Sequence, residues 1–424
     1  MTIFVILIFI LGYLLIVFEH PLRLNKTVPA LLTGVLIWTV IFMQNSHNLP
    51  FFQEELAKNL AKIAEILFFL KGAMVIVELI DLHKGFNLVT KLVRTDSKVK
   101  LLWLIGLVAF FLSAILDNLT TTIVLISLIR RLIPSNEDRI WYASVVVIAA
   151  NAGGAWSPIG DVTTTMLWIG GKISSWLLIK NLFLPSLVCT VLPLCILSFH
   201  KNFRGKTILY PEQEKLQNEE LLSSRTMLFV GLAALLFVPI FKTITQLPPY
   251  MGMLLAMAIV WLVSEYIHPE EDFSEERKDL YAAQHAISRV DFSSILFFLG
   301  ILLAISGLES LHLLQTLADS MDLLLPNKNW VAIAMGAVSA VIDNVPLVAA
   351  SMSMYTDIAD APFWHFIAFT AGTGGSMLII GSAAGVAAMG LEKISFIWYL
   401  KKITWLAALG YAAGALVFLL INKN

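Results

Sequence analysis

Apolar runs separated by short polar or basic connectors extend over almost the whole sequence. A hydrocarbon core of about 30 Å requires about 20 consecutive helical residues, so runs that approach this length are candidate membrane helices. Uninterrupted runs lie at residues 2–18, 28–43, 60–80, 174–199, 227–241, 250–267 and 403–421. We therefore predict an all-α polytopic membrane protein in which each of these runs is one helix.

One further run, at residues 141–171, is interrupted by the sequence Asn151-Ala-Gly-Gly-Ala-Trp-Ser-Pro-Ile-Gly-Asp161-Val-Thr-Thr-Thr165. Each flank is too short to cross the hydrocarbon core alone, but the two flanks together are long enough. Backbone groups freed by glycine and proline are tolerated at membrane depth only beside a cavity or inside the protein. The pattern predicts a broken transmembrane helix with Asp161 as a functional-site residue. The alternative is a surface loop in which Asp161 caps a short helix.

A second kind of interruption lies within residues 101–129, where Asp117-Asn-Leu-Thr-Thr-Thr122 divides the apolar run. Both ends of this run are basic, and basic connectors remain on the cytoplasmic side of a membrane. A segment with both ends on one side does not cross, so we predict a re-entrant hairpin with residues 117–122 at its tip. The same rule places the connector that contains Lys26 in the cytoplasm and both chain termini outside.

The pattern starts again in the second half of the chain. Asp343-Asn-Val-Pro346 is similar to the first hairpin tip, and Gly374-Gly375 corresponds to Gly153-Gly154. Connectors that are basic in the first copy are acidic in the second, which predicts that the second copy is inverted in the membrane. Inverted repeats, each with a re-entrant hairpin and a broken transmembrane helix, are typical of secondary transporters. We predict the second hairpin tip at residues 343–346 and the second broken helix at residues 363–396.

The composition supports this class, because 58% of the 424 residues are hydrophobic, 14% are charged and the mean hydropathy is +0.81. A net charge of -1 without a basic tail gives no reason to expect a nucleic-acid partner, so the lipid bilayer is the expected partner. The predicted organisation is N-terminal transmembrane helices at residues 1–59, a first inverted repeat at 60–199, a cytoplasmic linker at 200–226, a helical pair with a cytoplasmic loop at 227–291, and a second inverted repeat with the final helix at 292–424.

Two hairpin tips and two helix breaks are expected to meet near the middle of the membrane. Their carboxylates, hydroxyls and unwound carbonyls suit Na⁺ or Li⁺. These segments contain no Lys or Arg, which an anion site would be expected to have. The candidate cation- and proton-binding residues are Asp117, Asn118, Thr120, Thr121, Asn151, Asp161, Thr163, Thr164, Asp343, Asn344, Thr373 and Ser382. Na⁺ is assigned to Asp117, Asn151, Asp161 and Asp343, and no cofactor is expected. Because Asp161 and Ser382 occupy corresponding positions, the site is expected to be asymmetric.

Two further sets of residues carry weaker hypotheses. Lys71 and Glu78 lie two turns apart on one face of residues 60–80 and form a candidate ion pair or proton path. The alternative is that Lys71 pairs with a carboxylate on a neighbouring helix. Histidines, among them His83, His312 and His365, are expected at surfaces, where only their ordinary pKa of about 6.5 suggests a pH-sensing role.

On the sequences at residues 117–122, 151–165 and 343–346, the chain resembles the NhaD family of sodium/proton antiporters over nearly its whole length. The resemblance implies a bacterial inner-membrane protein that exports Na⁺ or Li⁺ in exchange for H⁺. It also implies a homodimer with a scaffold and a mobile transport part. We expect Na⁺ and H⁺ to compete for one shared carboxylate site that has alternating access to the two sides of the membrane.

Two alternatives remain at this stage. Anion carriers of the same superfamily take dicarboxylates or arsenite; the dicarboxylate carriers have Ser-Asn-Thr at their hairpin tips, where this chain has Asp-Asn. An intramembrane lipid-modifying enzyme is the second, because Asp319-x-x-Asp322 and Asp357-x-x-Asp360 are similar to Mg²⁺-binding aspartates. Both pairs lie outside the helix breaks, so we expect a secondary transporter and not an enzyme.

Overall fold

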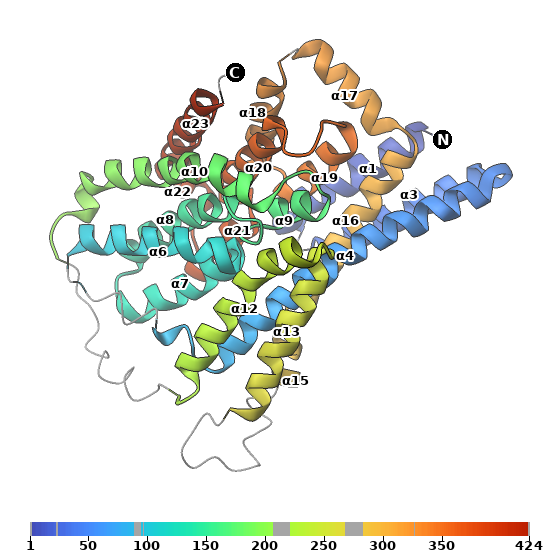
Figure 1. The fold of residues 1–424 in the computed structure, drawn as a ribbon. Coiled ribbons are helices and arrows are strands. Elements are labelled where there is room, and N and C mark those ends of the chain that lie inside the picture. The colour runs from blue at the N-terminus through green and yellow to red at the C-terminus, as the bar shows by residue number, and fades with distance from the viewer. Residues whose placement is uncertain are drawn as a thin grey trace.

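The computed structural model consists of helices and connecting turns over the residues that it describes, which are 2–22, 24–88, 95, 97–206, 221–267, 283–325 and 327–422 (Figure 1). The helices long and apolar enough to cross a membrane are α3 (Thr27–Gln44), α6 (Lys98–Leu116), α10 (Ser175–Ser198), α12 (Ser224–Thr245), α13 (Pro249–Tyr266), α16 (Phe292–Ser310) and α23 (Thr404–Ile421). They confirm the prediction of an all-α polytopic membrane protein. Much of the predicted linker at 200–226 and of the following loop lies outside the described residues.

The third predicted run is part of a much longer helix, α4 (Leu49–Leu82). Its 34 residues extend over about 51 Å at 1.5 Å per residue, more than the hydrocarbon core needs. Its proline is in the first turn, where the missing N–H group costs no helical hydrogen bond. The predicted boundary between residues 59 and 60 therefore falls inside one continuous helix. The first run forms α1 (Thr2–Val17), as a separate helix packed on α3.

The run that contains the first predicted tip folds as two helices, α6 and α7 (Asn118–Leu132), which are separated by Asp117. Lys98 at the start of α6 lies 2.8 Å from Asp138 in α8 (Asn136–Ala155), and α8 begins directly after α7. Tyr142 of α8 also donates a hydrogen bond to the Lys98 carbonyl. α6 therefore begins on the side of the molecule where α7 ends, which we call face A.

A second pair of helices is closed at its base in the same way. α18 (Lys328–Ser339) and α19 (Asn344–Met354) are separated by residues 340–343. Lys328 at the start of α18 lies 2.7 Å from Asp357, which follows α19. The two pairs are helical hairpins with matching ion pairs at their open ends.

α10 shows that the two hairpins open on opposite sides. Beyond its C-terminal end, the Gly205 carbonyl accepts a hydrogen bond from the Lys98 N–H group at face A. Before its N-terminal end, the Ser174 N–H group donates to Asp360, close to the base of the second hairpin. The 24 residues of α10 separate these contacts by about 36 Å. The second hairpin consequently opens on the opposite side, which we call face B.

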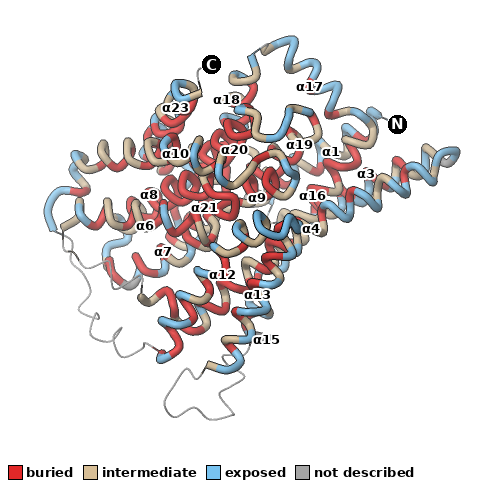
Figure 2. Tube along the Cα trace, viewed as in Figure 1, coloured by how far each residue is buried: buried red, intermediate tan, exposed pale blue. Residues whose placement is uncertain are grey.

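Two interrupted helices fill the centre of the molecule between the hairpins. α8 is followed after residues 156–161 by α9 (Val162–Ile169), and α20 (Pro362–Gly374) is followed after residues 375–382 by α21 (Ala383–Glu392). Most of α20 and the C-terminal part of α8 are buried and belong to the red core of Figure 2. α21 ends at face A, where Glu392 lies between Arg130 and Arg139 at 2.7 and 3.0 Å. The two interrupted helices therefore run in opposite directions.

The outer helices present apolar side chains to their surroundings. Leu36 of α3, Leu236 of α12 and Leu262 of α13 are exposed in the single chain. Exposed side chains of this kind are expected to contact lipid in a membrane. The remaining described helices are α2 (Glu19–Leu22), α15 (Ala283–Arg289), α17 (Leu313–Leu324) and α22 (Phe396–Lys402).

Candidate functional site

The two hairpin tips and the helix break after α8 meet at a small cavity of about 80 Å³. Three carboxylates line it, one from each of these segments, and α16, α4 and α21 complete its wall. Its polar lining residues are Lys26, Asp117, Asn118, Thr120, Asp161, Thr165, Ser294, Asp343 and Asn344. Six of them are predicted site residues. The cavity therefore brings together side chains from both halves of the chain.

The first hairpin tip is formed by Asp117, whose φ of 91° lies in a region that non-glycine residues seldom adopt. Its carboxylate accepts hydrogen bonds from the N–H group and the hydroxyl of Thr120, both at 2.8 Å. These bonds cap α7 and stabilise the sharp reversal after α6. The backbone strain and the cap together hold a carboxylate at the cavity wall.

Amide side chains connect the first hairpin to both interrupted helices. Asn118 donates to the Asn151 side-chain oxygen at 3.1 Å, and Asn151 donates in turn to the Ser382 hydroxyl at 3.1 Å. Ser382 also accepts from the Gly385 N–H group and so caps α21. All three side chains are buried. Asn151 and Ser382 therefore lie behind the cavity wall and position Asn118 instead of lining the cavity.

Asp161 is the most buried of the three carboxylates, with 2% of its surface exposed. It precedes α9, and its side chain accepts hydrogen bonds from the Thr163 hydroxyl (2.9 Å) and the Asn344 amide (3.0 Å). Asn344 belongs to the second hairpin, so this bond joins the two halves of the chain. Within the described residues, no ion pair involves Asp161. A buried carboxylate with neutral partners alone favours a proton or a bound cation as its counter-charge.

Asp343 has a charged partner that the sequence analysis missed. The ammonium group of Lys26 lies 3.4 Å from its carboxylate, and the side chains of both residues are part-buried. The expectation that the site contains no cationic group is therefore wrong. Lys26 immediately precedes α3 and was assigned to a cytoplasmic connector, but its long side chain reaches into the protein.

The remaining predicted residues are less directly involved. The Thr164 hydroxyl donates to the Asp161 carbonyl and the Thr373 hydroxyl donates to the Phe369 carbonyl, so both satisfy the backbone. The hydroxyl of Thr121 is buried without a hydrogen-bond partner in the described part of the chain. None of these three lines the cavity.

The suggested pair of Lys71 and Glu78 is not formed. Glu78 instead lies 3.4 Å from Arg289 of α15, and Lys71 lies 6.0 Å from the centre of the Phe292 ring. Spacing along one helix could not reveal this, because Arg289 comes from a distant part of the chain.

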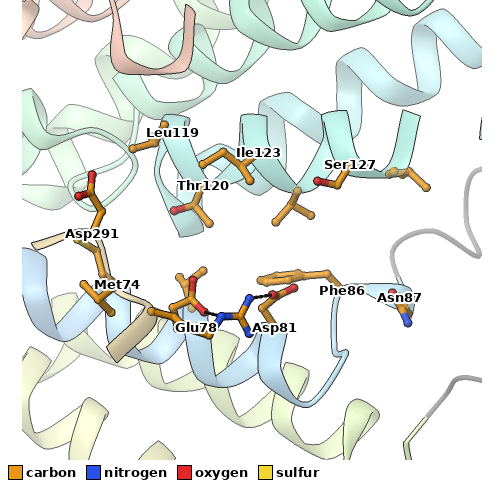
Figure 3. A pocket seen from close by; sticks show the side chains of 15 residues that line it. Met74, Glu78, Asp81, Phe86, Asn87, Leu119, Thr120, Ile123, Ser127 and Asp291 are labelled. Atoms are coloured by element: carbon orange, nitrogen blue, oxygen red, sulfur yellow. Dashed lines mark hydrogen bonds and ion pairs between the residues drawn. The ribbon is translucent and has the colours of Figure 1, made fainter. Parts of the chain in front are cut away.

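A larger cavity of about 470 Å³ is lined by Ser127 and Leu128, in the half of α7 that ends at face A (Figure 3). Glu78 and Asp81 lie on one wall, where both are linked to the same guanidinium group of Arg289. Met74, Leu119 and Thr120 line both this cavity and the smaller one. The larger cavity, which we call the face A vestibule, therefore approaches the Asp117 side of the site.

Two of the histidines expected at surfaces are buried. His83 lies between the hydroxyls of Ser223 and Ser264 at 2.8 and 3.0 Å, and burial lowers its pKa to about 4. It therefore stays neutral near pH 7 and is a poor pH sensor. His365 is also buried, 3.4 Å from Asp360. Only His312 of the three is exposed, as predicted.

Comparisons with known proteins identify the family of the chain. The citrate transporter family matches residues 13–365. Two relatives from Arabidopsis thaliana, sodium/proton antiporters 1 and 2, are 49% and 46% identical over 98% of this chain, which cover 72% and 99% of the respective relatives. The Na⁺/H⁺ antiporter NhaD of Alkalimonas amylolytica is 31% identical over 99% of this chain and 90% of its own length. The chain belongs to the NhaD antiporter family.

As a member of the NhaD family, the protein is a secondary transporter and not an enzyme. The acidic pairs that are similar to enzyme motifs have structural partners in this NhaD-type chain. Asp357 pairs with Lys328, Asp360 accepts a hydrogen bond from the Ser174 N–H group, and Asp322 accepts one from the Tyr355 hydroxyl. These contacts lie at face B, away from the central cavity.

Proposed function

We propose that the protein exchanges Na⁺ for H⁺ at the cavity between the two hairpin tips. The observation that carries the proposal is the convergence of Asp117, Asp161 and Asp343 on one cavity of about 80 Å³. Carboxylate and amide oxygens are suitable ligands for a small hard cation. The names of the relatives, sodium/proton antiporters, support the same substrate pair.

The arrangement of the hydrogen-bond donors leaves amide oxygens available to a cation. Asn118 and Asn344 direct their NH₂ groups at Asn151 and Asp161, so those bonds do not use their carbonyl oxygens. The cavity has room for a cation and a few water molecules. We expect Asp117 and Asp161 to bind Na⁺ directly, with the amide oxygens and Asp343 as additional ligands.

Exchange would follow from competition between Na⁺ and protons for these carboxylates. A bound Na⁺ displaces the proton, and reprotonation on the other side of the membrane releases Na⁺. One site then needs only alternating access, and two hairpins that open on opposite faces supply a structural basis for it. The face A vestibule would be the access route in the conformation described here, and the inverted repeat remains our interpretation of the two matching halves.

Direct competition makes a kinetic prediction. Lowering the pH should raise the apparent KM for Na⁺, by up to about tenfold per pH unit for each competing proton, while the maximal rate at saturating Na⁺ stays nearly constant. The measurement is Na⁺-dependent proton movement in vesicles that contain the purified protein, over about two pH units. Vesicles without protein are the control. A constant KM with a collapsing maximal rate would instead indicate a separate proton sensor.

An anion carrier is the second candidate, because the matched family is described as citrate transporters and Lys26 lies in the cavity wall. The charges argue against it, since three carboxylates face one ammonium group. The cavity volume of about 80 Å³ also argues against an anion carrier, because citrate would need more space than a small cation with a few water molecules. Uptake of labelled citrate by the same vesicles distinguishes the two functions.

We also propose that face A is cytoplasmic. Arg130, Arg139 and Arg289 lie at this face, and positively charged connectors remain inside. Both termini would then be outside, on the side of α17 in Figure 1. Location in a bacterial inner membrane and assembly as a homodimer remain predictions.

The orientation and the hairpin can be tested together. In a variant with Cys189 and Cys195 replaced by Ala, we introduce single cysteines for Lys100, Glu137 or Asp319. We expect an impermeant thiol reagent to label positions 100 and 137 only after the membrane is opened, and position 319 in intact cells. The cysteine-free parent is the control. Labelling of positions 100 and 137 from opposite sides would contradict the hairpin.

A further inference from the structure

Lys26 is held at the edge of the site by α3 and α16, which pack closely against each other. Its neighbour Thr27 donates a hydrogen bond to the Ser293 carbonyl at the start of α16. Further along the same pair, a Cβ atom at Gly300 would lie 2.5 Å from the backbone of Ala30. Lys26 is therefore anchored to α3 and α16, whereas its partner Asp343 belongs to the second hairpin.

The Lys26 ammonium group has two favourable contacts and remains partly accessible to water. It lies 3.4 Å from Asp343 and 4.4 Å from the centre of the Phe297 ring. The aromatic face gives it a second favourable contact. A quarter of the Lys26 side chain and 16% of the Asp343 side chain are exposed, so water can solvate the ammonium group if the pair separates.

We propose that Lys26 is a resident competitor for the transported cation, which occupies Asp343 in the empty site and is displaced when Na⁺ binds. This inference rests on the proposed function. It follows because Asp343 cannot coordinate Na⁺ fully while it neutralises an ammonium group 3.4 Å away. Asp161 differs, since its hydrogen-bond partners are the neutral side chains of Thr163 and Asn344.

Competition has two consequences for transport. The positive charge weakens Na⁺ binding, which sets the affinity of the site and assists release of the ion. Separation of the pair also removes one polar contact between the second hairpin tip and the α3–α16 pair. Lys26 is thus a positioning and affinity-determining residue, and Na⁺ binding is coupled to loss of one contact between the hairpin and its surroundings.

The test compares Lys26→Met with Lys71→Met. Methionine keeps an apolar chain against Phe297 but removes the charge. Lys71 also lies over a phenylalanine ring, but it does not line the cavity. We expect Lys26→Met to lower the apparent KM for Na⁺ by about three- to tenfold and to slow turnover, because a part-exposed ion pair is of modest strength. Lys71→Met and Lys26→Arg should keep a near-normal KM.

A second comparison separates competition from a structural role. Asp343→Asn leaves the ammonium group without its partner beside the site and should raise the KM for Na⁺. Adding Lys26→Met to Asp343→Asn should then lower that KM again. A structural tether predicts no such recovery, since removing both partners would not restore affinity. An unchanged or raised KM in Lys26→Met would overturn the proposal.

Na⁺ binding can be measured without transport as the rise in melting temperature of the purified protein with Na⁺ concentration. Lys26→Met should reach half of this rise at lower Na⁺ than the wild type. If the wild type neither binds Na⁺ nor exchanges it for protons, the proposed function is wrong. If the wild type does both and the variant binds Na⁺ no more tightly, only the role of Lys26 is wrong.

Discussion

Asp161→Asn is expected to abolish Na⁺/H⁺ exchange, with a loss in maximal rate of at least about 100-fold, equivalent to about 2.7 kcal/mol. The carboxylate is the buried group that binds the cation and the proton in the proposed function. An amide oxygen can contact a cation, but the amide has no negative charge to balance it and does not take up and release a proton. Ser382→Ala should reduce the maximal rate by less than about threefold, because the Ser382 hydroxyl does not line the cavity and reaches the site through Asn151. Its main effect should be a higher apparent KM for Na⁺.

The same vesicle assay measures both variants, and their melting temperatures show whether they fold. Asparagine has the shape of aspartate, so the hydrogen bonds with Thr163 and Asn344 can be rearranged without creating a cavity. Asp161→Asn should therefore melt near the wild-type temperature. Equal losses of maximal rate in Asp161→Asn and Ser382→Ala would contradict the asymmetry of the site.

The helix breaks could be predicted because glycine, proline and polar residues interrupt otherwise apolar sequence. The break after α8 lies at residues 156–161, inside the predicted gap. The length of α4 could not be predicted in the same way. Its N-terminal half contains several Glu and Lys residues, so hydropathy identified only the apolar part although nothing interrupts the helix.

The candidate site was predicted best where a polar residue lies at a break. Asp117, Asp161 and Asp343 all line the cavity. Thr373, in the last turn of α20, donates its hydroxyl to the backbone of its own helix instead, and sequence spacing does not give side-chain direction. Lys26 could not be found, because its contact with Asp343 joins segments 317 residues apart.

The close approach of each hairpin to an interrupted helix depends on glycine. A Cβ atom at Gly153 of α8 would lie 2.1 Å from the Phe110 carbonyl oxygen of α6, and one at Gly374 of α20 would lie 2.1 Å from the Gly336 carbonyl oxygen of α18. No side-chain rotation relieves a contact with backbone, so alanine must push the helices apart. We expect Gly153→Ala and Gly374→Ala each to destabilise the fold by about 1–3 kcal/mol.

Gly390→Ala is the matched control, because Gly390 lies in α21 and a Cβ atom there would meet nothing within 4 Å. Alanine has a higher helix propensity than glycine, so this variant should melt at or slightly above the wild-type temperature. Thermal unfolding of the three purified variants makes the comparison. Displacement of the hairpins also moves Asp117 or Asp343, so the two destabilised variants should lose exchange even below their melting temperatures. If both melted like Gly390→Ala, the hairpins would pack less closely against the interrupted helices than the structure shows, and the geometry of the carboxylate site would have to be revised.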